Sequence, residues 1–350
     1  MVPIAQTVRL AVAPKPEIDP MPNMNRRTLL AGAAATGALA ASAYVAAEDK
    51  ISVDHDMSGK SVLITGCSTG FGRLAAEKFA RQGAKVFATM RNLPRAEADE
   101  LRVLALNEKL DLQVIEIDVT SDSQVESGVQ QALAATGGTL DVLINNAGTS
   151  YGGPIEIQDM EATQHLFDVN VFGPHRMARA VLPAMRKAKS GLIINVTSQL
   201  GRVIVPAYAQ YSPTKFALEA MSEQLAYELV PHGIDVNIIE PGGYPTMIWK
   251  NSNENSLALL ERAEEKHTAG YQALIAQLGG RTGGGSTDPM DVPNAMAEII
   301  AMPAGTRPLR REVHPGAKPQ MAINKVSSEV QVGWLGGSPY GPWIKAVHNS

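Results

Sequence analysis

TGCSTGFG, which runs from Thr65 to Gly72, decides the fold, because it joins an apolar run to an amphipathic segment through three glycines. Glycine lets the chain turn sharply, and it lets backbone N–H groups and the start of the next helix approach a pyrophosphate. The spacing is G-x-x-x-G-x-G and not the dinucleotide fingerprint G-x-G-x-x-G, so a glycine-rich turn without a ligand is the alternative interpretation. The residues that we expect to contact a dinucleotide in this loop are Thr65, Gly66, Ser68, Thr69, Gly70, Phe71 and Gly72.

Short apolar runs alternate with longer amphipathic segments after about residue 56. The runs are nearly continuously apolar, as strands buried on both faces should be. We expect strands at 61–66, 85–90, 112–119, 140–148, 191–198, 234–242 and 309–314. We expect helices near 72–82, 94–109, 121–136, 160–188, 207–230 and 288–302. This order predicts an α/β fold of Rossmann type, a doubly wound parallel sheet with ligands at the carboxyl ends of its strands.

Polar, glycine-rich sequence interrupts the alternation between residues 243 and 287. It predicts one helix at 256–278 and a flexible glycine-rich segment after it. An insertion of this length at the ligand edge of a sheet is typical of a lid or a substrate-binding element. The predicted organisation is a single catalytic, dinucleotide-binding domain at 48–316, with a substrate lid at 243–287 and a C-terminal arm at 317–350.

The end of the second strand indicates which dinucleotide binds. Sites for NAD place an acid there to hold the ribose 2′-hydroxyl. This chain has Met90 followed by Arg91, with Arg95 nearby. A guanidinium offers paired donors that suit a 2′-phosphate. The sequence therefore favours NADP(H) over NAD(H), and the alternative is that Arg91 is an ordinary solvated charge.

Two further strand ends carry residues suited to the cofactor. Asp118, followed by Val119, ends the third strand, where its carboxylate suits an adenine amine or caps the helix that starts near Ser121. Small residues at the end of the fourth strand let the backbone lie against the adenosine ribose. The residues expected to do so are Asn146, Ala147 and Gly148.

Tyr211 and Lys215 lie four residues apart in YSPTK, so on a helix they share one face. A nearby ammonium favours the phenolate, and an acid–base group works best with a pKa near the operating pH. We therefore predict that Tyr211 is a general acid/base whose pKa Lys215 lowers, and that Ser198, at the tip of the fifth strand, hydrogen-bonds the substrate oxygen. Tyr and Lys at this spacing also occur by chance on many helices, so the pair needs the other signals.

The ordered motifs TGCSTGFG, NNAG and YSPTK resemble those of the short-chain dehydrogenase/reductase family over roughly residues 57–315. The resemblance implies a catalytic tetrad of Asn170, Ser198, Tyr211 and Lys215. It implies that Asn170 holds a helix carbonyl and a water that relays protons, and that Lys215 also binds the nicotinamide ribose. It implies that the segment after the sixth strand lines the nicotinamide, through Pro241, Gly242, Tyr244 and Thr246. Family members are commonly dimers or tetramers built on the two long helices, so we expect a homodimer or homotetramer.

Composition narrows the function classes. The chain has 350 residues, 45% of them hydrophobic, and a net charge of −4, so we expect no nucleic-acid partner. Its one cysteine, Cys67, excludes a disulfide framework and a Cys-rich metal site, and we expect no metal. Nothing basic lies beside Cys67 in the sequence, so it is interpreted as a packed residue and not as a reactive thiol.

The first 47 residues resemble an export leader. Arg26-Arg27 precede an uncharged, Ala-rich run that ends at Ala47. Paired arginines and small residues are typical of a twin-arginine signal, which predicts a periplasmic or exported protein without a stable membrane span after cleavage. An uncleaved membrane anchor, a cytoplasmic protein with a chance composition, and a true start at Met24 are the alternatives.

Three function classes follow. The first is an NAD(P)-dependent alcohol dehydrogenase or carbonyl reductase acting on a small molecule. The second is a non-catalytic nucleotide-binding sensor or scaffold, and the third is a dehydratase or epimerase with the same fold. The substrate is expected to be apolar, because the lid carries the side chains Met247, Ile248, Trp249, Leu257 and Leu260. The alternative is that these side chains form the inner face of a lid helix.

Overall fold

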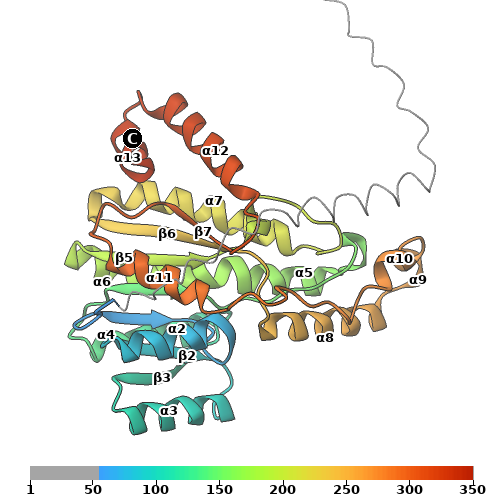
Figure 1. The fold of residues 1–350 in the computed structure, drawn as a ribbon, viewed down its shortest axis with the longest axis horizontal. Helices are drawn as coiled ribbons and strands as arrows, with labels where there is room; N and C mark the ends of the chain where they lie inside the picture. The colour runs from blue at the N-terminus through green and yellow to red at the C-terminus, as the bar shows by residue number, and fades with distance from the viewer. Residues whose placement is uncertain (1–54, 350) are drawn as a thin grey trace, which may run out of the picture. The chain divides into compact units, whose positions relative to one another are not determined.

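The computed structural model describes residues 55–349, so the leader predicted at 1–47 lies outside the described residues. A seven-stranded, all-parallel sheet runs through them in the order β3-β2-β1-β4-β5-β6-β7 (Figure 1). The order reverses between β1 and β4, and this switch point is where doubly wound sheets bind ligands. The strands are β1 (Ser61–Ile64), β2 (Lys85–Met90), β3 (Leu112–Glu116), β4 (Val142–Asn145), β5 (Gly191–Val196), β6 (Ile234–Pro241) and β7 (Arg310–Val313).

Helices cover both faces of the sheet, which explains why the central strands are continuously apolar. Alternate residues of one strand serve two separate cores. On β1, Val62 and Ile64 pack with α2 (Gly70–Arg81), α3 (Ala96–Glu108) and α11 (Asp291–Ala301). Leu63 faces the other way, with α4 (Asp122–Ala134), α6 (Gly173–Ala188) and α7 (Tyr211–Leu229). The predicted fold class is confirmed.

The helix predicted at 160–188 is not continuous. It is divided into α5 (Met160–Phe167), a π-helical turn at Asp168–Phe172, and α6. Pro174 has no N–H to donate to the carbonyl of Asn170 four residues earlier. Instead the N–H of Gly173 bonds the carbonyl of Asp168, five residues back, and the turn widens.

The lid prediction was wrong about its helix. The segment 256–278 is not one helix, because α8 (Met247–Arg262) begins nine residues earlier and ends within it. Two four-residue helices follow, α9 (Glu265–Thr268) and α10 (Gln272–Ile275). Gly270, at a φ of +87°, turns the chain between them. Pro245 lies just before the N-cap Thr246 and favours the extended backbone from which α8 starts.

The C-terminal arm is helical, which the sequence analysis did not predict. It contains α12 (Gln320–Leu335) and α13 (Gly341–His348), which lie beside α7 in Figure 1. Ile344 is buried on this side, and the His348 ring contacts the Tyr227 hydroxyl at 2.7 Å. The arm is therefore joined to the helix that begins at Tyr211.

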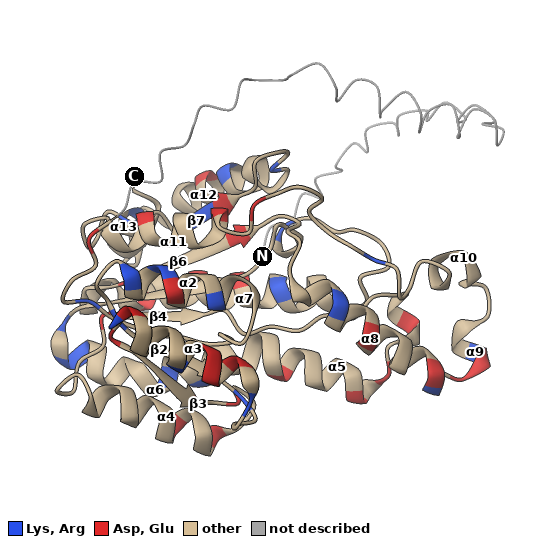
Figure 2. Ribbon diagram, turned by 60° about the horizontal axis from the view of Figure 1, so that its bottom comes forward, with Lys and Arg blue, Asp and Glu red and all other residues tan. Residues whose placement is uncertain are grey.

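Charged residues of both signs are interspersed over the ribbon in Figure 2. Ion pairs tie neighbouring helices together, as Arg81 Nε does with Glu108 Oε2 at 2.7 Å between α2 and α3. Within residues 55–349, no helix is both long enough and apolar enough to cross a membrane.

Candidate active site

A cleft of about 750 Å³ opens at the carboxyl ends of the strands. The glycine loop and the ends of β2, β3 and β4 form one side of it. The start of α7, the segment after β6 and the first turns of α8 form the other side. Most predicted site residues line it, namely Gly66, Ser68, Thr69, Gly70, Phe71, Arg91, Asp118, Val119, Asn146, Ala147, Gly148, Ser198, Tyr211, Lys215, Pro241, Gly242, Tyr244 and Thr246.

The glycine loop has no room for side chains at two of its glycines. Gly66 has a φ of +73°, and a Cβ there would lie 2.8 Å from the Cα of Ala147. At Gly72, a Cβ would lie 2.4 Å from Asn146 Nδ2 and 2.5 Å from the Gly66 carbonyl oxygen. The loop therefore lies directly against the end of β4, and only glycine permits that approach.

Thr65 and Gly72 do not line the cleft, contrary to the prediction. Thr65 is 1% exposed, and its hydroxyl oxygen accepts the N–H groups of Asn146 and Ala147 at 3.0 Å. Asn146 Nδ2 in turn donates to the Thr65 carbonyl at 2.9 Å. Thr65 and Asn146 join the end of β1 to the end of β4 behind the glycine loop. Packing, and not a cofactor contact, explains the positions of Thr65 and Gly72.

Cys67 is buried within the loop, as the sequence analysis predicted. Its N–H donates to the Thr89 carbonyl at 2.8 Å, and its thiol donates to the Ile64 carbonyl at 3.2 Å. Burial raises the pKa of this thiol to about 12. The thiol therefore stays protonated and unreactive while the loop is closed.

The loop fits a dinucleotide pyrophosphate. The N-cap Thr69 makes no side-chain hydrogen bond to the first turn of α2, and that turn contains no acidic residue. Within residues 55–349, no side-chain acceptor is therefore found for its leading N–H groups, which lie at the positive end of the helix dipole. Ser68, Thr69 and Gly70 bring this helix end to the cleft. Such a helix start is a ready anion site.

Two arginines lie at the β2 end of the cleft, but they differ in their partners. Arg95 forms paired bonds with Glu97, at 2.9 and 2.7 Å. Arg91 is exposed and has no carboxylate within salt-bridge distance among the described residues. Of the two, Arg91 has the guanidinium available for an anionic ligand.

Asp118 is not the helix cap that the sequence left open. The cap of α4 is Ser121, whose side chain accepts the N–H of Gln124. Asp118 Oδ1 instead accepts the N–H and hydroxyl of Thr120, at 2.9 and 2.7 Å. With Val119, Asp118 lines the cleft where the β3 end meets the glycine loop.

Ser198, Tyr211 and Lys215 meet at the centre of the cleft. Tyr211 is the first residue of α7, so its phenol lies at the helix start. Lys215, one turn later, is 5% exposed, and its Nζ donates to the Val196 carbonyl at 3.0 Å. The same Nζ lies 5.7 Å from the centre of the Tyr211 ring. A hydroxyl, a phenol and an amine thus converge from two elements.

The predicted lowering of the Tyr211 pKa is wrong for the protein without a cofactor. Burial raises the pKa of Tyr211 to about 12, against the opposite effect of a hydrogen bond with Ser198. Burial also lowers the pKa of Lys215 to about 8, while the charge of Glu219 acts in the opposite direction. The Lys215 ammonium points at a carbonyl and not at the phenol oxygen, which explains why it does not offset the loss of water around Tyr211.

Asn170 lies behind the cleft and does not line it. It is 1% exposed within the π-helical turn. Its amide accepts the Thr149 N–H at 2.9 Å and donates to the Thr149 carbonyl at 3.0 Å. It also donates to the Thr214 hydroxyl at 3.1 Å, and that hydroxyl bonds the Tyr211 carbonyl. Asn170 therefore connects the loop after β4 to the start of α7.

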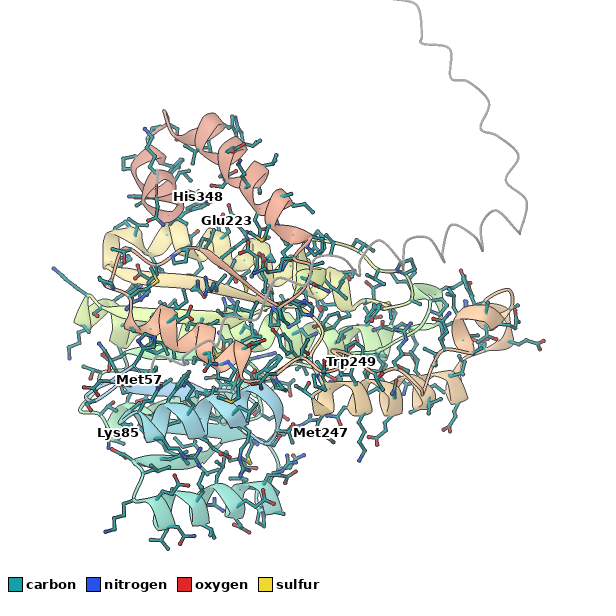
Figure 3. All side chains as sticks on the ribbon, viewed as in Figure 1. Met57, Lys85, Glu223, Met247, Trp249 and His348 are labelled. Atoms are coloured by element: carbon teal, nitrogen blue, oxygen red, sulfur yellow. The ribbon has the colours of Figure 1, made fainter. Side chains whose placement is uncertain are left out.

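The segment after β6 lines the cleft next to the first turns of α8. Tyr244 is buried, and its hydroxyl donates to Asp291 at 3.2 Å. Its ring lies nearly perpendicular to the ring of Phe71, and the two ring centres are 5.5 Å apart. Its carbonyl accepts the indole N–H of Trp249 at 2.8 Å. Of the five apolar lid residues, Met247, Ile248 and Trp249 line the cleft, and Leu257 and Leu260 do not. Figure 3 labels Met247 and Trp249 at the start of α8.

Sequence reasoning missed Tyr208, which lines the cleft three residues before Tyr211. Its ring contacts Trp249 edge-on at 6.4 Å and lies under the Arg281 guanidinium at 4.6 Å. The flanking Ala207 and Ala209 have φ values of +65° and +45°, which side-chain-bearing residues rarely adopt. Two hydrogen bonds with Gly153 hold this conformation, because the Gly153 N–H donates to the Ala207 carbonyl at 2.8 Å and the Ala209 N–H donates to the Gly153 carbonyl at 2.9 Å. No sequence pattern marks it, because alanine is not typical of such backbone.

The geometry agrees with the chain's similarity to known proteins. A family model for short chain dehydrogenases matches residues 60–257. An uncharacterized oxidoreductase of Bacillus subtilis (strain 168), YusZ, is 38% identical over 245 residues, covering 69% of this chain and 85% of that protein. Retinol dehydrogenase 8 of Homo sapiens is 34% identical over 284 residues, covering 77% of this chain and 86% of that protein.

A solved structure gives the same result. A short chain dehydrogenase/reductase from Burkholderia phymatum, in complex with NAD, superposes with a TM-score of 0.65 at 25% identity, covering 81% of this chain and 98% of that one. The family model spans strands β1 to β6, the glycine loop and helix α7. The chain belongs to the short-chain dehydrogenase/reductase family of oxidoreductases.

Proposed function

We propose that the protein is an NADP(H)-dependent alcohol dehydrogenase or carbonyl reductase in which Tyr211 is the general acid/base. The convergence of Ser198, Tyr211 and Lys215 in the cleft that the glycine loop borders is the observation that carries this proposal. A bound nicotinamide would supply or accept the hydride.

The side chains divide the remaining work. Ser198 is placed to hydrogen-bond the substrate oxygen, and Tyr211 gives a proton to that oxygen or takes one from it. A phenol with a pKa of about 12 is protonated at neutral pH, which is the form that reduction of a carbonyl requires. Lys215, still cationic below about pH 8, supports negative charge that develops on the phenol.

Arg91 supports the proposed preference for NADP(H). It is exposed at the β2 end, where an acid would favour NAD, and its neighbour Arg95 is paired with Glu97. A 2′-phosphate would give Arg91 the anionic partner that it lacks among the described residues. The similar structure from Burkholderia phymatum contains NAD. The dissociation constants of this chain for NADPH and for NADH are therefore to be compared directly.

The lid side of the cleft supports an apolar substrate. Met247, Ile248 and Trp249 line it together with Tyr208. Aromatic and aliphatic side chains stabilise apolar ligands by removing their surface from water. Retinol, the alcohol that gives the similar protein retinol dehydrogenase 8 its name, has an apolar body. We propose an alcohol or ketone with an apolar body.

Replacing Tyr211 by phenylalanine tests the mechanism. We expect Tyr211→Phe to lower kcat about 10²- to 10⁴-fold, the typical contribution of a general acid. The dissociation constant for NADPH and the melting temperature should remain those of the wild type, and Tyr340→Phe, the same change on an exposed arm residue, is the control. Undiminished turnover by Tyr211→Phe would exclude the mechanism.

A substrate panel separates the alternative functions. NADPH oxidation is measured with ketones, aldehydes and quinones of increasing apolar length. Net oxidation of NADPH supports the proposal. Tight NADPH binding without turnover on any member would favour the sensor or scaffold, and substrate conversion without net NADPH oxidation would favour a dehydratase or epimerase.

A further inference from the structure

A cluster of buried charges lies directly behind the Tyr211 site, between α7 and the strands β6 and β7. Glu219 is 1% exposed and Glu240 is fully buried. Arg310 reaches three carboxylates, with its Nε 2.8 Å from Glu219 Oε2 and 3.6 Å from Glu240 Oε1, and its Nη2 2.6 Å from Glu223 Oε2. We call these four residues the Arg310 cluster.

Glu219 is the member of the Arg310 cluster that lies next to the site. Glu219 lies one helical turn after Lys215 on the same face of α7. Its Oε1 accepts the hydroxyl of Thr197 at 2.6 Å, and Thr197 is the residue immediately before Ser198. Thr197 also donates to the Ile239 carbonyl at 3.2 Å. Glu219 is thus the member that links the two elements bearing Ser198 and Lys215.

The carboxyl groups of the Arg310 cluster differ in how their surroundings act on them. Burial, followed by the charge of Glu219, raises the pKa of Glu240 above its usual range. The pKa of Glu223 is held low by His348 and Arg310 despite its burial. One guanidinium, that of Arg310, is thus shared among the carboxyl groups of Glu219, Glu223 and Glu240.

Two further ionisable groups, one from β7 and one from α13, lie beside the Arg310 cluster. From β7, Glu312 accepts Asn324 Nδ2 at 2.8 Å, and the same Nδ2 donates to Glu240 at 2.8 Å. From α13, His348 Nε2 lies 3.6 Å from Glu223, and Figure 3 shows these two side chains on the same side of α7. The Lys215 amine contacts the Val196 carbonyl and the Tyr211 ring, and the charge that acts on it is that of Glu219. Glu219 is therefore the carboxylate best placed to act on Lys215.

We propose that Glu219 is a positioning residue of the Tyr211 site, which fixes the Ser198 strand end through Thr197 and holds the Lys215 amine in its ammonium form through its negative charge. This inference rests on the proposed function, because it assigns Lys215 a charged role. It adds a residue outside the cleft to the catalytic arrangement, since Glu219 does not line it.

Removing the charge of Glu219 removes the negative charge that favours the ammonium form of Lys215. A buried ammonium without its counter-charge loses its proton more readily, because the neutral amine avoids the desolvation penalty. Glu219→Gln keeps the size of the side chain and its ability to accept the Thr197 hydroxyl. The substitution therefore separates the charge from the packing.

Lys215 can be titrated directly in the protein without cofactor or substrate. In protein labelled with ¹³C at lysine Cε, the Lys215 resonance is assigned by its absence in Lys215→Met. We expect its transition near pH 8 in the wild type and at least about one unit lower in Glu219→Gln. Glu219→Asp, which keeps the charge, should restore most of the shift.

Glu223→Gln is the matched control. It removes a carboxylate from the same helix and the same arginine, but eight residues from Lys215. We expect it to move the Lys215 transition by less than half as much. An equal shift in Glu223→Gln, or no shift in Glu219→Gln, would overturn the assignment to Glu219.

The pH profile of turnover supplies a second readout. For Glu219→Gln we expect kcat at pH 8 to fall about tenfold with KM nearly unchanged, and to recover as the pH is lowered to 6. A loss that is the same at every pH would indicate a merely structural role and contradict the inference. Because the titration needs no turnover, a wild type that reduces no carbonyl would count against the proposed function and not against the role of Glu219.

Discussion

The two sides of the cleft are built differently. The nucleotide side, from the glycine loop to Gly148, is held by hydrogen bonds of backbone groups and of Thr65 and Asn146, and by contacts too close for any side chain. The lid side, 247–287, is held mainly by side chains, and its Gly283 and Gly284 also lie close against Trp249 and Tyr244. Leu259 packs into a small cluster with α5, and Arg262 binds Asp159 at 2.7 Å on the surface.

This difference indicates how the work is divided. A backbone cradle with no spare volume accepts one kind of ligand and tolerates little change. The first helix of the lid is fixed by side-chain bonds such as Ser256 Oγ with the Gly152 N–H at 2.7 Å, and side-chain contacts of this kind can be exchanged without moving the sheet. The nucleotide side is therefore expected to set cofactor binding, and the lid side to set the substrate.

The largest expected effect is in the glycine loop. In Gly72→Ala the new methyl group would overlap Asn146 Nδ2 and the Gly66 carbonyl, which costs about 1–3 kcal/mol of stability by overpacking. We expect the loop to shift and NADPH affinity, measured by calorimetry, to fall about 100-fold. Gly280→Ala on the lid is the control, because nothing lies within 4 Å of its added Cβ. Equal losses in both variants would erase the distinction between the two sides.

The second effect is at Arg91. We expect Arg91→Ala to raise the dissociation constant for NADPH about tenfold to a hundredfold, by removing a charge-assisted bond to the 2′-phosphate, and to leave that for NADH nearly unchanged. Arg95→Ala should affect NADPH less, because Arg95 is paired with Glu97. If NADPH and NADH weaken together in Arg91→Ala, Arg91 does not discriminate between them.

A third, smaller effect is expected on the lid. Trp249→Leu removes the bond to the Tyr244 carbonyl and the contact with Tyr208. The KM for an apolar ketone should rise about fivefold while the NADPH dissociation constant stays constant, since aromatic contacts contribute about 1 kcal/mol. Leu257→Ala, on the exposed side of α8, should change neither value. A parallel change in NADPH binding would show that the lid also serves the nucleotide side.

The smallest effect is expected where the two sides meet. Ala207 has a φ of +65°, so Ala207→Gly relieves strain and should stabilise the protein by up to about 1 kcal/mol in thermal unfolding. Ala258→Gly on helix α8 should do the reverse, destabilising by about 0.5–1 kcal/mol through helix propensity. Destabilisation by Ala207→Gly would mean that the loop is not strained.

The sheet could be predicted because its signal is local. Strand β2, expected at 85–90, is found at Lys85–Met90, since a strand buried on both faces must be continuously apolar. The order of strand ends then places Arg91 and Ser198 at one edge without further information. Tyr211 at the start of α7 follows from Pro213, which fits only a first helical turn.

The rest depends on contacts between distant residues. The lid helix starts at Met247 because Trp249 binds Tyr244 and Leu259 packs on α5, and polar sequence shows neither contact. The direction of the Tyr211 pKa depends on where the Lys215 ammonium points, which spacing along a helix does not determine. The sequence does not predict the helices of the arm, because its bonds to α7 join residues more than 100 positions apart.

Cys67 gives this protein a chemical reporter of its own. It is the only thiol in the chain, and it is sealed inside the turn that borders the nucleotide site. A maleimide can reach Cys67 only when the glycine loop opens. The labelling rate of the unmodified protein therefore measures how often this loop opens. Saturating nucleotide should slow the labelling, which provides a binding assay that needs neither a known substrate nor an engineered cysteine.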